Sequence, residues 1–302
     1  MSSPAAAQRP FVVSLGELLW DLLPAGPQLG GAPANVACHA AALGARAAVV
    51  SCVGNDPLGR QAVSILQSRG LDTEAIEALA GVPTGTVHVE VDASGHPRFD
   101  IVRDVAWDRL TAGEAGSASR VRVATADAVC FGTLAQRTPG ARAAVHALLE
   151  EVRADALRVF DINLRPPFHA PDVIEESLRG ANVLKLNEDE LPVLSAQLGW
   201  AGSVEGQVRA VAGRFGLRAV ALTLGARGAG LLLEDTWTTE PGRSVDVRDA
   251  VGAGDAFTAV LIMGLLLKWE ARAILTRATD VAAYVCTQPG ATPVLPASWR
   301  MA

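Results

Sequence analysis

The sequence comprises 302 residues with a formal net charge of −6; half of the residues are hydrophobic and 19% are charged. This composition excludes disorder for the bulk of the chain, and the acidic balance without any Lys/Arg-rich run argues against nucleic acids and anionic membranes as partners. The longest apolar stretch, Ala256 to Leu267, is too short for a membrane span, which takes about 20 residues.

The N-terminus lacks the apolar region of a signal peptide, and the four cysteines are isolated along the chain. The histidines are equally scattered, so the sequence shows no zinc-binding spacing. We therefore expect a cytoplasmic protein whose cysteines are buried and reduced.

Short apolar runs alternate with segments of helical pattern along the chain. The expected strands are Phe11–Leu15, Ala47–Val53, Ala128–Phe131, Arg158–Ile162, Asn182–Leu186 and Ala219–Leu224. The expected helices are Pro33–Leu43, Leu58–Arg69, Pro139–Arg153, Asn187–Leu198, Val204–Phe215 and Ala256–Trp269, and a loop with an irregular helix is expected over Thr111–Thr125. Since continuous apolar strands are typical of a sheet covered on both faces, this order predicts an α/β fold with a parallel sheet.

One segment departs from this pattern. Thr84–Asp92 alternates between polar and apolar residues with period two, a turn is expected at 93–95, and Pro97–Arg103 continues as an extended segment. This arrangement predicts a β-hairpin with one solvated face, and Leu18–Leu23 is an extended piece that could join it.

We interpret these segments as a small β-sheet lid inserted in the α/β body. Its parts lie near 16–29 and 84–104, and such flaps often close over substrates. A β-meander at the edge of the domain is the alternative. In either case we expect a single domain over residues 1–302, since the sequence has no internal repeat and no low-complexity linker.

The clearest local motif is Asp249–Phe257, which follows an extended run at Ser244–Val247 and opens the long apolar helix. Gly252-Ala253-Gly254 at a helix start leaves backbone amides open to an anion, and the helix dipole adds positive charge. Asp255 beside such a site is unsuited to bind an anion, but it is suited to remove a proton from a hydroxyl that attacks a phosphoryl group. The alternative is that Asp255 only caps the helix and the glycines form a tight turn.

A second motif, Gly30-Gly31 followed by Asn35, precedes the first predicted helix. The glycines allow a ligand to approach the backbone, and the Asn35 amide can both donate to and accept from sugar hydroxyls. By itself such a pair of glycines is more often only a turn.

Together these segments resemble the ribokinase/PfkB family of carbohydrate kinases, and the resemblance covers nearly the whole chain. The matching segments, in chain order, are Asp21, Gly30–Gly44, Val53–Gly59, Asn187–Glu190, Thr223–Gly228 and Asp249–Phe257. The resemblance implies a ribokinase-like three-layer sandwich with a small β-sheet lid, and it implies ATP and Mg²⁺ as cofactors. It strengthens the interpretation of Asp255 as the catalytic base over that of a helix cap.

The resemblance also implies roles for the remaining site residues. Asp21, Gly30, Gly31, Asn35 and Arg165 would bind the sugar, while Gly252, Ala253, Gly254 and Asp255 would form the catalytic centre. Asn187, Glu190, Thr223, Gly225, Gly228 and Thr279 would contact the nucleotide, with Asn187 and Glu190 placing Mg²⁺ indirectly. A monovalent cation such as K⁺ near Asp249 and the carbonyls of Cys286–Gly290, and a homodimer formed through the lid, are further family features.

Several segments look like the fructokinase branch of the family, namely Gly16-Glu17 with Asp21, Leu29–Ala37, Ala106–Asp108, Phe131–Leu134 and Asp161–Arg165. Two positions depart from the family pattern, because Ala250 replaces a threonine of the signature and Thr279 stands where an asparagine is frequent. Arg165 would follow a strand end, where it could pair with phosphate or an acidic substrate; alternatively it is a surface arginine.

We therefore expect an ATP-dependent kinase for a primary hydroxyl, with fructose as the leading substrate. The alternatives are a kinase for 2-keto-3-deoxygluconate, ribose or a nucleoside, and a non-catalytic sugar- or nucleotide-binding regulator of the same fold. A dehydrogenase is disfavoured because the first strand–helix connection lacks G-x-G-x-x-G, and no G-x-x-x-x-G-K-[ST] phosphate loop is present.

Overall fold

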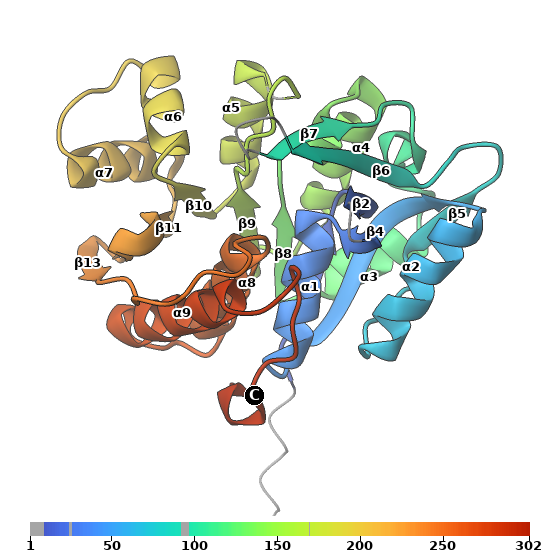
Figure 1. Ribbon diagram of the computed structural model, residues 1–302. Coiled ribbons are helices and arrows are strands. Elements are labelled where there is room, and N and C mark those ends of the chain that lie inside the picture. Colours follow the sequence, from blue (N-terminus) through green and yellow to red (C-terminus); the bar gives the residue numbers. More distant parts are fainter. Residues whose placement is uncertain (1–8, 24–25, 92–96, 169) are drawn as a thin grey trace, which may run out of the picture.

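The computed structural model describes residues 9–23, 26–91, 97–168 and 170–302, with only the backbone described at 89–91 and 97–99. Its main sheet has nine strands in the order β13-β12-β11-β10-β9-β8-β1-β4-β5 (Figure 1). These strands are β1 (Phe11–Leu15), β4 (Arg46–Gly54), β5 (Ile76–Leu79), β8 (Ala128–Phe131), β9 (Leu157–Asp161), β10 (Val183–Asn187), β11 (Ala219–Thr223), β12 (Ala229–Leu233) and β13 (Thr236–Glu240). All neighbours from β11 to β5 pair in parallel, whereas β12 and β13 add an antiparallel edge.

Helices cover both faces of this sheet and complete a three-layer sandwich. One face carries α1 (Ala32–Ala42), α2 (Pro57–Ser68), α8 (Ala253–Leu266) and α9 (Ala271–Cys286). The other face carries α3 (Ala118–Thr125), α4 (Pro139–Glu150), α5 (Pro171–Gly180), α6 (Glu190–Leu198) and α7 (Val204–Phe215). Short 3₁₀ turns lie at Ala106–Arg109, Leu134–Gln136, Gly225–Arg227 and Ala297–Trp299. No helix of the described residues is long and apolar enough to cross a membrane.

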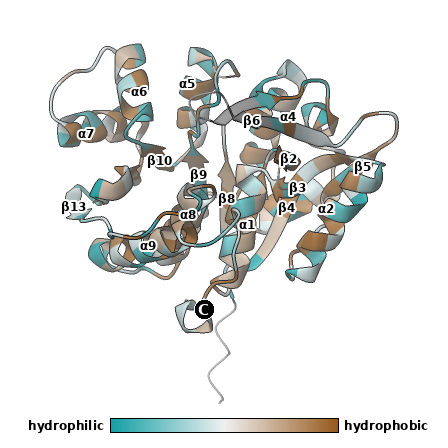
Figure 2. Cartoon of the chain, in the orientation of Figure 1, coloured by the Kyte–Doolittle hydropathy of each residue, from teal (hydrophilic) through white to brown (hydrophobic). Residues whose placement is uncertain are grey.

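The central strands are apolar without interruption because successive side chains point to opposite faces of the sheet and both faces are buried. In β1, Val12 packs in the α8/α9 core while Val13 and Leu15 pack in the opposite core, and Val159 and Phe160 of β9 divide in the same way. A central strand that is covered on both faces is therefore hydrophobic at nearly every position. Figure 2 accordingly draws β8 and β9 in hydrophobic colours and the edge strand β13 in hydrophilic ones.

The predicted lid is present as a second, four-stranded sheet in the order β3-β2-β6-β7. Its strands are β2 (Leu19–Leu23), β3 (Gly26–Gly30), β6 (Gly85–Val91) and β7 (Pro97–Ile101). β2 pairs with β3 and β6 pairs with β7 in antiparallel fashion, and a parallel contact between β2 and β6 joins the two hairpins. The turn predicted at 93–95 and the N-terminal residues 1–8 lie outside the described residues.

Some element boundaries were predicted wrongly. Ser244–Val247 is not a strand, and α8 begins at Ala253 and ends at Leu266 instead of running from Ala256 to Trp269. Asn187 ends β10 and does not begin a helix. The antiparallel pair β12–β13 was not predicted; β12 is a short apolar run of five residues, and β13 is a polar edge strand of five residues.

Candidate active site

A cavity of about 990 Å³ lies at the carboxyl ends of the parallel strands, where α/β folds bind their ligands. The lid contributes Leu19, Asp21, Val87 and Ile101 to one end of its wall. The other end is formed by residues after β11 and by α9, and the first turn of α8 lies between. Of the predicted site residues, only Gly30, Glu190 and Asp249 are not part of the cavity wall.

The start of α8 supplies the predicted anion site. Gly252 caps the helix with φ of 82°, and a side chain there would collide with the carbonyl of Ala291, so glycine is required. The first-turn amides of an α-helix have no partner within the helix. The Ala253 amide donates to the Ala250 carbonyl at 3.4 Å, whereas the amides of Gly254 and Asp255 have no partner among the described residues and offer donors to an anion in the cavity.

Asp255 lies in this first turn and is held by a residue far away in the sequence. The Asn35 side-chain amide of α1 donates to Asp255 Oδ2 at 2.8 Å, across 220 residues of chain. Burial and the nearby Asp161 carboxylate raise the pKa of Asp255 to about 6, whereas the Asn35 hydrogen bond and the cations Lys185 and Arg165 lower it. The carboxylate is thus ionised at neutral pH and can accept a proton from a bound hydroxyl.

The lid brings Asp21 to the same cavity. Asp21 is half-buried on β2, and burial raises its pKa to about 6 while Arg165 lowers it. Gly30 stands beside it on β3, where any side chain would collide with the Asp21 carboxylate. Gly31 starts α1 with φ of 106° and packs directly on the backbone of Glu17.

Arg165 is exposed, as its surface interpretation predicted, yet it lines the cavity. Its positive charge lowers the pKa of Glu17, Asp21 and Asp255, so the guanidinium lies near all three carboxyl groups. An exposed arginine among three acids remains free to turn toward a ligand.

The predicted nucleotide side lies at the opposite end of the cavity. Thr223 ends β11, and Gly225 and Gly228 follow with φ of 55° and 105°. Gly228 also packs against the Glu240 carbonyl, so it additionally fixes the turn into β12. On α9, the buried Thr279 hydroxyl has no hydrogen-bond partner among the described residues.

Asn187 and Glu190 form a closed turn. Asn187 Oδ1 accepts hydrogen bonds from the backbone amides of Asp189 and Glu190 at 2.9 Å, and Glu190 Oε2 accepts one from the backbone amide of Asn187 at 2.8 Å. The second Glu190 oxygen accepts the Leu164 amide at 2.9 Å. The described residues contain no cluster of three acidic, His or Cys side chains suited to a metal. Asn187 and Glu190 therefore fit Mg²⁺ only if water and phosphate oxygens supply the direct ligands, which is the usual mode for this ion.

The Asp249 carboxylate also accepts hydrogen bonds from backbone amides. Its two oxygens accept the amides of Val251 and Gly290 at 3.0 Å each, and the Cys286 carbonyl accepts the amides of Arg248 and Asp249. These contacts join the loop before α8 to the segment after α9. A monovalent-cation site here stays a prediction.

Two buried ionisable residues on the cavity wall, Glu17 and Lys185, had no role predicted for them. Glu17 follows β1 and is 4% exposed, and its Oε2 has no partner among the described residues. Burial raises the pKa of Glu17 to about 7. Lys185 lies in β10 and donates to Asp161 at 3.1 Å. A charged residue inside an otherwise apolar strand was the signal that could have revealed Lys185.

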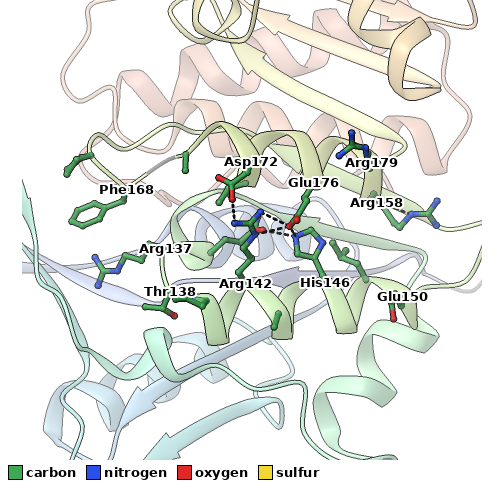
Figure 3. A pocket seen from close by; sticks show the side chains of 18 of the residues that line it. Arg137, Thr138, Arg142, His146, Glu150, Arg158, Phe168, Asp172, Glu176 and Arg179 are labelled. Carbon is green, nitrogen blue, oxygen red and sulfur yellow. Dashed lines mark hydrogen bonds and ion pairs between the residues drawn. The ribbon is translucent and has the colours of Figure 1, made fainter. Parts of the chain in front are cut away.

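A second hollow of about 1000 Å³ lies between α4 and α5 (Figure 3). Arg142 donates to Asp172 and Glu176 across it at 2.6 and 2.8 Å, and His146 lies 3.1 Å from Gln136 Oε1. These polar groups in the middle of the hollow are thus paired with one another.

Comparison with known proteins identifies similar chains. The model of the pfkB family of carbohydrate kinases matches residues 26–298. A putative sugar kinase of Pyrococcus horikoshii is 31% identical over 85% of this chain and 83% of its own length, and its ATP complex covers 93% of this chain and 94% of its own with a TM-score of 0.79. Fructokinase-1 of Zea mays is 31% identical over 96% of both chains. Fructokinase of Vibrio cholerae, solved with fructose, ADP and calcium, has a TM-score of 0.78 at 25% identity, covering 95% of this chain and 96% of its own.

Proposed function

Because the chain belongs to the pfkB family of carbohydrate kinases, we propose that it transfers the γ-phosphoryl group of ATP to a primary hydroxyl of fructose. The observation that carries this proposal is the position of Asp255. It lies at the amide-rich start of α8, oriented by Asn35, between the lid end and the nucleotide end of one cavity.

This geometry supports a direct transfer. The sugar hydroxyl gives its proton to the Asp255 carboxylate as its oxygen attacks the γ-phosphorus, and the bond from that phosphorus to the ADP oxygen breaks. The unpaired amides of Gly254 and Asp255 stabilise the charge on the transferring phosphoryl group. Mg²⁺, held by the phosphates and water beside Asn187 and Glu190, would neutralise part of the phosphate charge.

The charges at the acceptor end favour an uncharged sugar. Three carboxyl groups, of Glu17, Asp21 and Asp255, surround a single guanidinium, that of Arg165. Carboxyl groups and the Asn35 amide hydrogen-bond well to hydroxyls, while a substrate carboxylate would meet like charge. The maize and Vibrio relatives are both fructokinases, which adds support for fructose. The positive charge of Arg165, by contrast, favours an acidic substrate such as 2-keto-3-deoxygluconate.

The test is a comparison of kcat/KM, measured by ADP release, for fructose, ribose, adenosine and 2-keto-3-deoxygluconate. We expect fructose to give the highest value. A competitor ahead by tenfold, about 1.4 kcal/mol in transition-state binding, would overturn the choice of sugar. Absence of turnover with every acceptor would instead favour a non-catalytic binding protein.

A further inference from the structure

A buried ion pair lies directly behind the first turn of α8. Asp161 and Lys185 are paired neighbours on β9 and β10, and Lys185 Nζ donates to Asp161 Oδ1 at 3.1 Å. Their side chains are 6% and 7% exposed. The Thr258 hydroxyl of α8 donates to Asp161 Oδ2 at 2.8 Å and lies 3.0 Å from the Gly254 carbonyl oxygen. The pair is thus tied to the turn that carries Asp255.

The ammonium group of Lys185 is directed at this turn. Its Nζ would lie 3.3 Å from a Cβ atom placed on Gly254, and Lys185 forms part of the cavity wall. An ammonium has three N–H donors, and the contact to Asp161 uses one of them. The surrounding carboxylates of Asp161, Glu190 and Asp255 raise the pKa of Lys185, so it stays protonated.

Every charged or titratable group near Asp255 can be assigned to an element. They are Glu17 after β1, Cys130 on β8, Asp161 on β9, Arg165 after β9 and Lys185 on β10, with Glu190 of α6 facing Lys185. Asn35 of α1 adds the hydrogen bond. Burial raises the pKa of the Cys130 thiol well above its usual value, so it carries no charge at neutral pH. Among these groups, Asp161 is the carboxylate that most raises the pKa of Asp255, and Lys185 opposes it.

We propose that Lys185 is a positioning residue for the catalytic base: held beneath α8 by Asp161, which the Thr258 hydroxyl in turn ties to that helix, it places a positive charge behind the turn that carries Asp255 and keeps this turn in place. This inference rests on the proposed role of Asp255. The proposal also explains why a buried lysine is present at all. Packing alone does not require it, because a pair of apolar residues could fill the same interior space.

The test compares the pH dependence of kcat in Lys185→Met and Asp161→Asn with that of the wild type. Removing the cation raises the pKa of Asp255, so the acid limb of Lys185→Met moves to higher pH. Removing the carboxylate lowers that pKa, so the limb of Asp161→Asn moves to lower pH. Each shift is expected to be about one pH unit, the size typical of a close charge. A merely structural role would lower kcat without moving the two limbs in opposite directions.

Lys268→Met is the matched control, since Lys268 is exposed at the far end of α8, and its limb should coincide with that of the wild type. Limbs of the two single variants that stay in place or move the same way would overturn the proposal.

Either single change leaves an unpaired buried charge and can prevent folding. The double variant Lys185→Met/Asp161→Asn removes both charges and then carries the test. Its limb should stay close to that of the wild type, and a displacement of about one unit would contradict the proposal. A separate result, full kcat in Asp255→Asn, would instead reject the assignment of the base.

Discussion

At the scale of single residues, Asp255 is the side chain on which the proposed chemistry depends. Asp255→Asn keeps the size of the side chain and an oxygen that can accept from Asn35, so fold and ligand binding should survive. Because the amide cannot take up the proton, kcat should fall by at least about a hundredfold, within the 10² to 10⁴ typical of general bases. This corresponds to roughly 3 to 5 kcal/mol of barrier.

The measurement is kcat with saturating sugar and ATP, with binding of each ligand followed separately. Asp246→Asn provides the control, since Asp246 is an exposed carboxylate in the preceding loop. An Asp255→Asn protein that folds, binds both ligands and keeps nearly full kcat would reduce Asp255 to a helix cap.

At the scale of elements, the lid is the part expected to respond to substrate. It consists of two hairpins joined by β2 and β6, and it carries Asp21 opposite Asn35 of the body. A sugar that forms hydrogen bonds with both Asp21 and Asn35 would hold the lid against the body. We therefore expect amide hydrogen exchange in β2 and β6 to slow at saturating fructose.

Amides of α7, on the far side of the sheet and not part of the cavity, are the internal reference. Unchanged exchange in β2 and β6 under saturation would show that the lid is a fixed meander. That result would favour the alternative interpretation of the hairpin and leave the role of Asp255 untouched.

At the scale of the whole molecule, the buried carboxyl groups of the cavity make stability depend on pH. Burial raises the pKa of Glu17 from 4.5 to about 7, so the folded state holds a proton there that the unfolded state has lost. The stability linked to this proton is complete below pH 4.5 and is lost as the pH rises to about 7. His39, whose pKa burial lowers to about 4, acts in the opposite direction.

Glu17→Gln isolates the pH-dependent stability that is linked to the Glu17 proton, because His39 is present in both the variant and the wild type. Without ligands, the variant should gain stability relative to the wild type as the pH rises from 4.5 through 7, by up to about 3 kcal/mol. Urea unfolding at a series of pH values measures this difference. A difference that stays constant with pH would mean that Glu17 is not a buried, protonated group.

Local patterns in the sequence were sufficient to predict the parallel sheet, the hairpin of the small second sheet and the place of Asp255 in the first turn of a helix. Apolar runs predicted the parallel strands, period-two alternation predicted the lid hairpin, and the Gly-Ala-Gly-Asp motif located Asp255. These features are encoded within a few consecutive residues, since strand and helix periods and glycine turns depend on neighbouring positions.

Only the tertiary structure decided the environment of those residues. The contact of Asn35 with Asp255 spans 220 residues, and the burial of Glu17 and the pairing of Lys185 with Asp161 need three separate strands in place. Asn187, Glu190 and Asp249 matched family motifs, yet their oxygens prove to be occupied by backbone amides. The physical reason is that burial and charge separation are properties of the packed chain, and they determine which ionisable groups hold a proton.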